Sequence, residues 1–407
     1  MIPKGTMSVI AARSVLPRPD APELLRRAGE VASLARVRAD RTEAERRISE
    51  EIIGEMRRAE LFRVMQPQMF GGFEYGFEVF AQIGATLAQG CGSTGWVYGL
   101  LASHQWLAGC FPLQAQEEFW AEPSALAAGS YAPAGQGTPV ESGWRFSGQW
   151  GFCSGCDNAQ WLFLGAMIPQ QDGPPKPGFI LAPASECIID DNWHTMGLAG
   201  TGSKNIIAQE VFVPSHRAVT FADLIAGTSP GTRVHGNPVF RQSFLAVLPV
   251  TIVAPVLGMA EGALADFLDM AKVRTTRGAV AGGNRKMAEL TNIQLRVAEA
   301  AACIEAARRI AFSNLAEAYD SVARGEPIGI EMRIRNRRDQ SFCVRLCVQA
   351  IDALFLASGG QGIFLSTPLQ RAWRDAHAAA SHVSLNWDST GSMVGQYLLG
   401  LEPKGQY

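Results

Sequence analysis

The stretch SGGQGIFLSTPLQRAWRDA, residues 358–376, links two segments with helical periodicity near the end of the chain. Its glycine pair stops the apolar pattern of residues 334–358, and Pro368 starts another predicted helix that runs to about Gly395. Upstream, residues 251–274 and 286–323 repeat apolar side chains at three- and four-residue spacing. Three helices of about 25–40 residues and a fourth predict an up-and-down helical bundle. We assign this bundle to residues 221–407.

The residues before the bundle fall into two further regions. Residues 22–63 and 77–107 show helical periodicity, so a helical domain is predicted for residues 1–124. In residues 125–220, frequent Gly and Pro separate short runs such as WRFSGQW and NIIAQEVFVP, which predicts a middle β domain, a barrel or sandwich. The predicted fold class is therefore α+β, in the order helical domain, β domain and C-terminal four-helix bundle.

Composition narrows the class of function. The 407 residues include 36 Lys+Arg and 38 Asp+Glu, for a formal net charge of −2. This balance provides no global field to hold nucleic acid or an anionic membrane, so the expected partner is a small molecule bound at a local site. The eight cysteines form no dense ladder, and no stretch approaches ~18 uninterrupted apolar residues. We therefore expect a soluble cytoplasmic protein.

The short motifs typical of metal sites, catalytic nucleophiles and nucleotide-binding loops are either missing from the sequence or stand outside the sequence context that they require. Cys153 and Cys156 have the spacing of a redox or metal motif, but no second such pair lies nearby, so we interpret them as structural thiols. The six histidines form no HExxH or HxH pattern, and no GxSxG accompanies them. The Gly-rich runs at 281–285 and 358–362 lack the strand-turn-helix context of a nucleotide-binding loop. No metal site is predicted.

The order of segments resembles the acyl-CoA dehydrogenase superfamily over nearly the whole chain. WHTMGLAGTGSKNIIAQEVFVP (193–214) looks like the hairpin of that superfamily, and KVRTTRG (272–278) resembles its arginine-bearing helix start. The most specific part is the opening stretch, which is similar to the superfamily's Gly-Gly-x-Gly turn followed by an Arg-Asp dipeptide. The resemblance implies the same three-part fold.

One departure from that superfamily bears on the chemistry. The dehydrogenases abstract a substrate proton with a carboxylate, commonly placed after the Arg-Asp dipeptide, but here no Glu lies between Asp375 and Glu402, and His382 stands near that position. This replacement looks like the flavin-dependent monooxygenase branch, the oxygenase components of two-component aromatic hydroxylases such as p-hydroxyphenylacetate hydroxylase. The matching pieces are residues 92–104, 144–164, 196–205 and 382–403.

The resemblance implies a cofactor and partners. A separate NAD(P)H:flavin reductase would supply diffusible reduced FMN or FAD, O2 would add at flavin C4a, and the C4a-hydroperoxyflavin would hydroxylate a small phenolic or related aromatic or heteroaromatic substrate. Because the flavin carries the redox chemistry, the protein has to exclude water, orient the ring and manage protons. The resemblance also implies a homotetramer.

Three residues are the candidates for catalysis. His104, at the end of an apolar helix, would stabilise the oxygenated flavin or bind substrate; the alternative is a helix-end cap. Ser154 matches a position that reaches the flavin N5 and O4 edge in the family; the alternative is a turn serine. His382 would bind a phenolic hydroxyl and increase its phenolate character, with solvent exposure as the alternative. Asn386 is a further substrate-binding candidate, and Asp388 is a candidate for fixing an imidazole tautomer.

The cofactor candidates come from three parts of the chain. Arg274 and Arg277 would bind the flavin phosphate, together with the backbone amides of Gly359, Gly360 and Gln361 from a turn that commonly belongs to a neighbouring subunit in the family. Trp150, Phe152 and Trp193 would wall the isoalloxazine, or would simply be core residues. Thr201 and Ser203 complete the cofactor set.

Three other functions stay open from the sequence. The first is an acyl-CoA dehydrogenase-type flavoenzyme with an atypical base. The second is oxygen transfer to sulfur, nitrogen or an indole ring, and the third is a non-catalytic flavin carrier. The sequence does not name the substrate.

Overall fold

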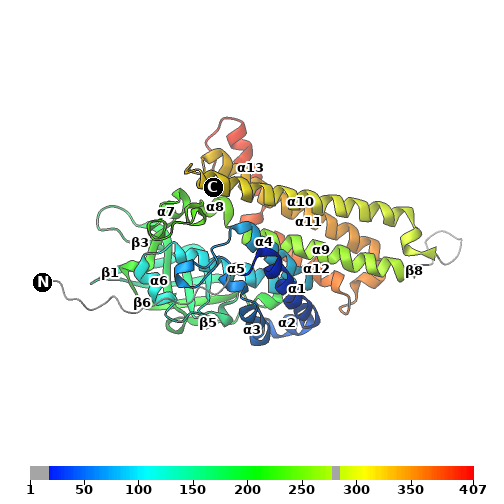
Figure 1. Cartoon of the computed structure of the whole chain (residues 1–407), viewed down its shortest axis with the longest axis horizontal. Helices are drawn as coiled ribbons and strands as arrows, with labels where there is room; N and C mark the ends of the chain where they lie inside the picture. The colour runs from blue at the N-terminus through cyan, green and yellow to red at the C-terminus, as the bar shows by residue number, and fades with distance from the viewer. Residues whose placement is uncertain (1–17, 277–284) are drawn as a thin grey trace.

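The N-terminal region is helical, as predicted. The computed structural model describes residues 18–276 and 285–407, and Figure 1 shows their arrangement. The first helices are α1 (Ala21–Val37), α2 (Ala39–Glu45), α3 (Glu50–Arg58), α4 (Phe77–Gly90), α5 (Gly92–Gly109) and α6 (Leu113–Phe119). Asp20 and Ser49 cap α1 and α3 by accepting backbone N–H groups. Every residue of α5 is buried, so this helix lies at the centre of the region.

The middle region is rich in β-strands, as predicted, and seven of them form one hydrogen-bonded sheet. Its strands are β1 (Ala127–Val140), β2 (Gly143–Cys153), β3 (Trp161–Ile168), β4 (Lys176–Pro183), β5 (Ile188–Asp190), β6 (Lys204–Pro214) and β7 (Ala218–Thr220). Their order is β5-β6-β2-β1-β3-β4-β7, and no ladder joins β5 to β7 in the described ranges. The register of β1 shifts between Ser130 and Gly135: its first residues pair only with β3 and its last only with β2. One irregular strand thereby joins both halves of a single sheet.

The C-terminal region contains the three predicted long helices. They are α9 (Val250–Val273), α10 (Thr291–Ala323) and α11 (Ile330–Ser358), and they extend side by side away from the sheet (Figure 1). Two short helices, α7 (Phe221–Ala226) and α8 (Phe244–Val247), connect the sheet to this bundle. A two-stranded ladder of β8 (Thr275–Thr276) and β9 (Arg285–Lys286) closes the far end.

The fourth helix of the bundle is shorter than the sequence predicts. It ends at Ala380 as α12 (Pro368–Ala380), and a new helix, α13 (Trp387–Leu398), follows the 3₁₀ turn η11 (Val383–Leu385). Two side chains cap the new turns: His382 accepts Ser384 N–H, and Asn386 accepts Ser389 N–H. Such local bonds compete with helix continuation. His382 therefore lies at a helix break and not on a helix.

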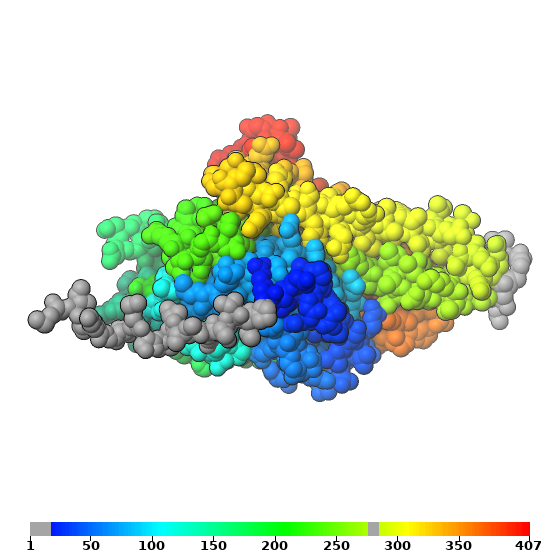
Figure 2. Space-filling view, viewed as in Figure 1, coloured from blue at the N-terminus to red at the C-terminus, as the bar shows by residue number. Residues whose placement is uncertain are grey.

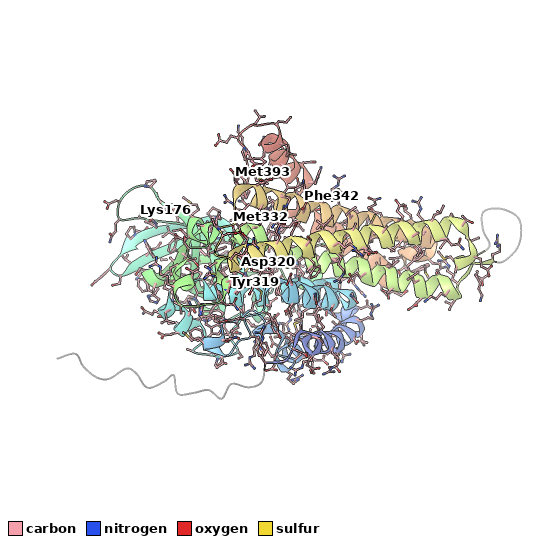
Figure 3. The ribbon with its side chains drawn as sticks, turned by 45° about the horizontal axis from the view of Figure 1, so that its top comes forward. Lys176, Tyr319, Asp320, Met332, Phe342 and Met393 are labelled. Carbon is pink, nitrogen blue, oxygen red and sulfur yellow. The ribbon has the colours of Figure 1, made fainter. Side chains whose placement is uncertain are left out.

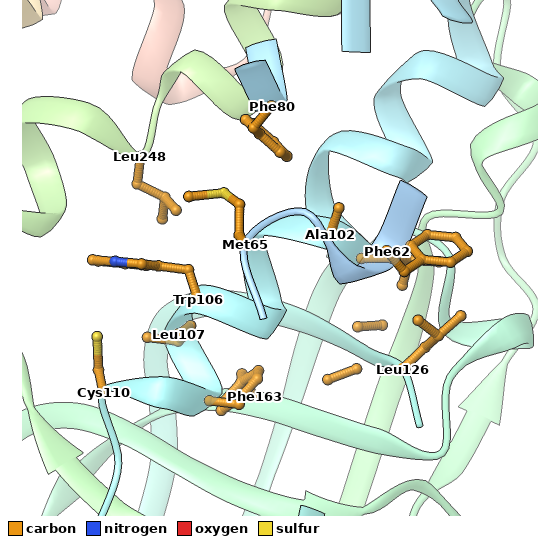
Figure 4. Close-up of a cluster of buried hydrophobic side chains, with 14 of the residues drawn as sticks. Phe62, Met65, Phe80, Ala102, Trp106, Leu107, Cys110, Leu126, Phe163 and Leu248 are labelled. Atoms are coloured by element: carbon orange, nitrogen blue, oxygen red, sulfur yellow. The ribbon is translucent and has the colours of Figure 1, made fainter. Parts of the chain in front are cut away.

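Two apolar cores hold these layers together. The first joins the N-terminal helices to the sheet: Trp106 and Leu107 of α5 lie near Phe163 of β3 and Met65 (Figure 4). The second lies inside the bundle, among α9, α10, α11 and α12. Helix α13 protrudes from the body (Figure 2) and rests through Met393, labelled in Figure 3, on Ile334 of α11.

Two helical segments, residues 244–273 and 330–363, are long and apolar enough to cross a membrane by composition alone. The apolar window of the first is 89% buried, as expected of a core helix, and that of the second is 44% buried.

Candidate functional site

A chain of buried hydroxyl groups connects α5 to the loop before β6. Trp96 Nε1–H donates to Ser154 Oγ at 3.2 Å, Ser154 lies 2.6 Å from Ser203, and Ser203 lies 2.6 Å from Thr201. Thr201 donates to the Leu198 carbonyl at 2.7 Å. Because that carbonyl accepts only, each hydroxyl proton points toward it: Ser154 donates to Ser203, and Ser203 to Thr201. Ser154 Oγ is left with acceptor capacity alone.

The loop that carries Thr201 and Ser203 is fixed on two sides. Asp375 of α12 is buried, and its carboxylate accepts Leu198 N–H at 2.6 Å. Burial raises the pKa of Asp375 to about 6. On the other side, Lys204 Nζ binds Asp157 at 2.9 Å. The buried carboxylate of Asp375 thus holds the loop.

An exposed apolar surface lies beside Ser154. Phe152, two residues before it, is 72% exposed and has a φ of 60°, which non-glycine residues seldom adopt. Its ring meets Trp193 edge to face at 5.9 Å, and Met196 is exposed nearby in the chain. Backbone strain is tolerated where the surroundings impose it, and it clusters at functional sites. A flat ring would find an apolar wall here and a polar edge at Ser154.

His382 reaches the same place from the helix break. Its ring lies 5.9 Å from the Trp96 ring, whose N–H binds Ser154. Its Nδ1 accepts Ser384 N–H at 3.1 Å, so the neutral ring carries its proton on Nε2 and is a donor there. Burial, and secondly the charge of Arg337, lower the pKa of His382 to about 4. His382 is therefore a neutral donor at physiological pH.

Arg337 is a buried cation beneath the His382 loop. It donates to the carbonyls of Ser384 at 3.0 Å and Gln406 at 3.2 Å, and to Gln340 at 2.8 Å. No carboxylate lies within 4.0 Å of its guanidinium among the described residues. Burial lowers its pKa to about 10, so it stays charged.

His104 lies in a different environment, sealed between α5 and β1. It is fully buried, its Nδ1–H donates to the Ala127 carbonyl at 2.6 Å, and its Nε2 accepts the Tyr131 hydroxyl at 2.8 Å. Burial lowers the pKa of His104 to about 4. Within the described ranges it shares no hydrogen bond or ring contact with Ser154 or His382.

Several other predicted residues lie away from the serine chain. Trp150 is buried inside the sheet region and donates to the Gly165 carbonyl at 2.7 Å, so it is a core residue. Asn386 caps α13, and Asp388 is exposed. Cys153 and Cys156 are buried free thiols, and contact with Cys156 and burial raise the pKa of Cys153.

The predicted phosphate-binding residues gather at the far end of the bundle. Arg274 donates to the Ser358 carbonyl at 2.7 Å, directly before Gly359, Gly360 and Gln361, which lie in the 3₁₀ turn η10 (Gly359–Ile363). Arg277 lies outside the described residues. The 13 residues of α12, about 20 Å at 1.5 Å per residue, separate this turn from His382.

Sequence reasoning missed three residues of this region. Trp96 and Tyr131 sit in apolar contexts where aromatic side chains are usually core. Arg337 is one of several arginines in the run RIRNRR, and the pattern gives no sign that this one is buried. An arginine on the buried face of a helix would have indicated a special role, but only the fold reveals which face of this helix is buried.

Comparisons with known proteins assign this arrangement of helices, sheet and bundle to a class of flavoenzymes, the acyl-CoA dehydrogenase superfamily. Residues 250–387 match the family model "Acyl-CoA dehydrogenase, C-terminal domain". The chain is 46% identical over 391 residues to the FADH(2)-dependent resorcinol hydroxylase, oxygenase component, of Rhizobium sp., covering 94% of this chain and 96% of that protein.

Two solved structures extend the comparison. The HsaA monooxygenase from Mycobacterium tuberculosis superposes with a TM-score of 0.88 at 35% identity, covering 95% and 99% of the two chains. XiaF from Streptomyces sp., in complex with FADH2 and glycerol, superposes with a TM-score of 0.86 at 27% identity, covering 95% and 97%. The chain therefore belongs to the flavin-dependent monooxygenase branch of the acyl-CoA dehydrogenase superfamily.

Proposed function

We propose that the protein is the oxygenase component of a two-component system that uses reduced FMN or FAD and O2 to hydroxylate a phenolic or related aromatic substrate. A separate NAD(P)H:flavin reductase would supply the flavin, and the system would work in the cytoplasm. The observation that carries the proposal is the serine chain, which leaves Ser154 Oγ as an acceptor beside an apolar wall. The relatives named as oxygenase components of hydroxylases support the same reaction class.

The residues around Ser154 fit a reduced flavin. Reduced isoalloxazine carries an N5–H that the oxidised ring lacks, and an acceptor-only Ser154 would bind this hydrogen. Phe152 and Trp193 would contact the apolar face of the ring. Thr201 and Ser203 would act through Ser154, because their own protons are used within the chain. When bound, the flavin supplies oxygen activation and oxygen transfer.

His382 would supply a hydrogen bond to the reacting region. Its Nε2–H points away from the Ser384 amide that occupies Nδ1, and its ring lies against Trp96. A donor there would stabilise negative charge that develops on oxygen during transfer, or on the substrate hydroxyl. Burial, and secondly the Arg337 charge below the loop, keep the imidazole neutral, so no positive charge is carried into the site.

The separation of the two predicted cofactor regions supports a flavin site shared between copies of the chain, which a homotetramer would provide. Within one chain, the length of α12 separates the Gly359–Gln361 turn from His382, so the flavin ring and its phosphate would be held by different copies. A neighbouring copy would present that turn. Exposed apolar residues flank it, as an interface between copies requires: Leu356, Ile363, Phe364 and Leu365.

The test combines oxygen kinetics with product analysis. The full-length protein is mixed with reduced FMN or FAD and oxygen, and the transient absorbance of the oxygenated flavin is followed with and without resorcinol. His382→Ala should lower hydroxylated product per flavin by about 100-fold, whereas His216→Ala, whose ring binds Glu118 outside the site, should not. Normal hydroxylation by His382→Ala would remove His382 from the mechanism. No oxygenated species with either flavin would refute the oxygenase proposal.

A further inference from the structure

The loop before β6 contains a strained residue, Leu198, on which two parts of the proposed flavin site depend. Its φ is 53°, in the left-handed region that a bulky side chain seldom adopts. In this conformation the Leu198 carbonyl accepts the Thr201 hydroxyl at 2.7 Å, where the serine chain ends. The same carbonyl accepts the Trp193 indole N–H at 3.2 Å. The orientation of one carbonyl therefore sets both the direction of the serine chain and the place of the Trp193 ring.

The carboxylate of Asp375 holds Leu198 in this conformation. It accepts Leu198 N–H at 2.6 Å, and Asp375 is 3% exposed. A hydrogen bond to a carboxylate is charge-assisted and stronger than one to a neutral acceptor. The other carboxylate oxygen lies at the start of α5, where a Cβ on Gly92 would come within 2.9 Å of it. A helix N-terminus favours negative charge, so Asp375 joins the loop to the first turn of α5.

Arg374, the preceding residue of α12, binds the same loop. Its guanidinium donates to the Met196 carbonyl at 2.6 Å and pairs with Glu43 of α2. Gly197 lies so close to α12 that a Cβ would come within 2.2 Å of the Arg374 carbonyl oxygen, so the loop backbone rests directly on the helix. The Arg-Asp dipeptide therefore clamps residues 196–198 through contacts with the loop backbone.

We propose that Asp375 is a positioning residue of the flavin site: by holding Leu198 N–H, it aims the carbonyl that ends the serine chain and fixes the Trp193 ring. The inference rests on the proposed function for the identity of the ligand, and it adds what selects the redox state of that ligand. Without the carboxylate, Leu198 is free to leave its strained conformation, and its carbonyl no longer ends the chain. The hydroxyl protons can then reverse, so that Ser154 donates as well as accepts. An oxidised flavin, whose N5 accepts, would then bind about as well as a reduced flavin.

Flavin affinity in both redox states tests this role. Kd values for oxidised FMN and FAD, and for the reduced forms under anaerobic conditions, are measured with the full-length protein. The pH is about 8, because burial raises the pKa of Asp375 to about 6. The wild type should bind reduced flavin about tenfold more tightly than oxidised flavin. Asp375→Ala should reduce this ratio to about one, and Asp375→Asn, which keeps an oxygen acceptor, should retain it.

Asp339→Ala is the matched control, because Asp339 is a buried carboxylate that binds Arg338 and Asn314 within the bundle. Its ratio of the two Kd values should equal that of the wild type. Hydrogen exchange in the flavin-free protein gives a second readout. Exchange at residues 196–203 should rise in Asp375→Ala and return to the wild-type rate in Asp375→Asn. Urea unfolding of each variant separates this local change from a loss of global stability.

The outcomes separate the role of Asp375 from the function itself. If Asp375→Ala weakens the binding of both redox states equally, Asp375 only braces the fold and the proposal is overturned. Unaltered exchange at residues 196–203 also overturns it, and so does a wild type that does not discriminate between the redox states. A wild type that discriminates through Asp375, but whose reduced flavin gives no oxygenated species with O2, would leave Asp375 in its role and refute the oxygenase proposal.

Discussion

His104 and His382 are the same side chain in two opposite environments. His104 is enclosed by α5 and β1, with its Nδ1–H on a backbone carbonyl. His382 lies at the break between α12 and α13, with its Nδ1 accepting a backbone N–H. The backbone partner therefore fixes the tautomer in each case: His104 presents an acceptor at Nε2, and His382 presents a donor. Local backbone geometry, and not the residue type, assigns the two roles.

The two histidines also differ in what keeps them neutral. The pKa of each is lowered to about 4, and burial is the largest cause for both. Only His382 has a second cause that lowers its pKa, the charge of Arg337, whereas the hydrogen bond to the Ala127 carbonyl opposes the effect of burial at His104. The acidic residues on the flanking elements are engaged elsewhere, since Asp375 accepts Leu198 N–H and Asp339 pairs with Arg338. His104 thus depends on its enclosure alone, whereas His382 also depends on a cation.

The largest expected effect is the cost of protonating the enclosed histidine. The unfolded value of 6.5 exceeds the folded value of about 4, so the unfolded chain binds the proton more readily. Stability from His104 is therefore complete above pH 6.5 and is lost as the pH falls toward 4, by about 3 kcal/mol in total. Urea unfolding of the wild type and of His104→Asn, at pH values from 7 to 4, measures this difference.

Urea unfolding of His382→Asn over the same range of pH compares the two histidines directly. His382 is partly exposed, so solvent screens its charge and its share of the acid destabilisation should be smaller than that of His104. Carboxylates that titrate in the same range contribute equally to all three proteins and cancel. If the free energy of unfolding depended on pH more steeply through His382 than through His104, His104 would not be the more enclosed of the two histidines.

The next effect concerns the cation beneath His382. Arg337→Met removes hydrogen bonds to two carbonyls and to Gln340, and we expect a loss of about 2 kcal/mol in the free energy of unfolding. The pKa of His382 should rise toward its ordinary value, while that of His104 stays unchanged. Urea unfolding at pH 7 and the ¹⁵N titration of both rings measure these changes.

Arg345→Met is the control for Arg337 on the same helix. Arg345 stacks on the Trp387 ring, with its guanidinium carbon 4.7 Å from the centroid, so its removal should cost only about 0.5–1 kcal/mol. Equal movement of the pKa of His382 in both variants would mean that general loosening of α11, and not the Arg337 charge, acts on the histidine.

Much of the architecture follows from the sequence because long periodic segments decide it. The three long bundle helices and the buried helices before residue 110 agree with their apolar spacing. Ser154, Thr201 and Ser203 were also named from the resemblance, and the structure brings them into one chain of hydrogen bonds. Periodicity and family motifs are strong signals for these features.

The features that sequence reasoning missed depend on contacts between distant residues. The strand order of the sheet and the register shift in β1 depend on pairing between distant segments, and strand pairing of this kind leaves no local pattern. The break after Ala380 depends on two side-chain caps that a run of Ala and Ser conceals. Arg337 binds a carbonyl 47 positions away in the sequence, at Ser384, and Tyr131 binds His104, 27 positions away. Residue spacing carries no information about contacts at such separations.

The smallest predicted effect tests the helix break itself. Asn386→Ala removes the oxygen that accepts Ser389 N–H at the start of α13 and should cost about 1 kcal/mol of stability. Because the cap ends the loop that begins at His382, its loss should raise hydrogen exchange at Ser384 N–H, which holds His382 Nδ1. Exchange near His104 should not change, since that ring is held by Ala127 in the enclosed region. A variant that leaves Ser384 exchange unaltered would mean that Arg337, through the Ser384 carbonyl, positions His382 without help from the cap.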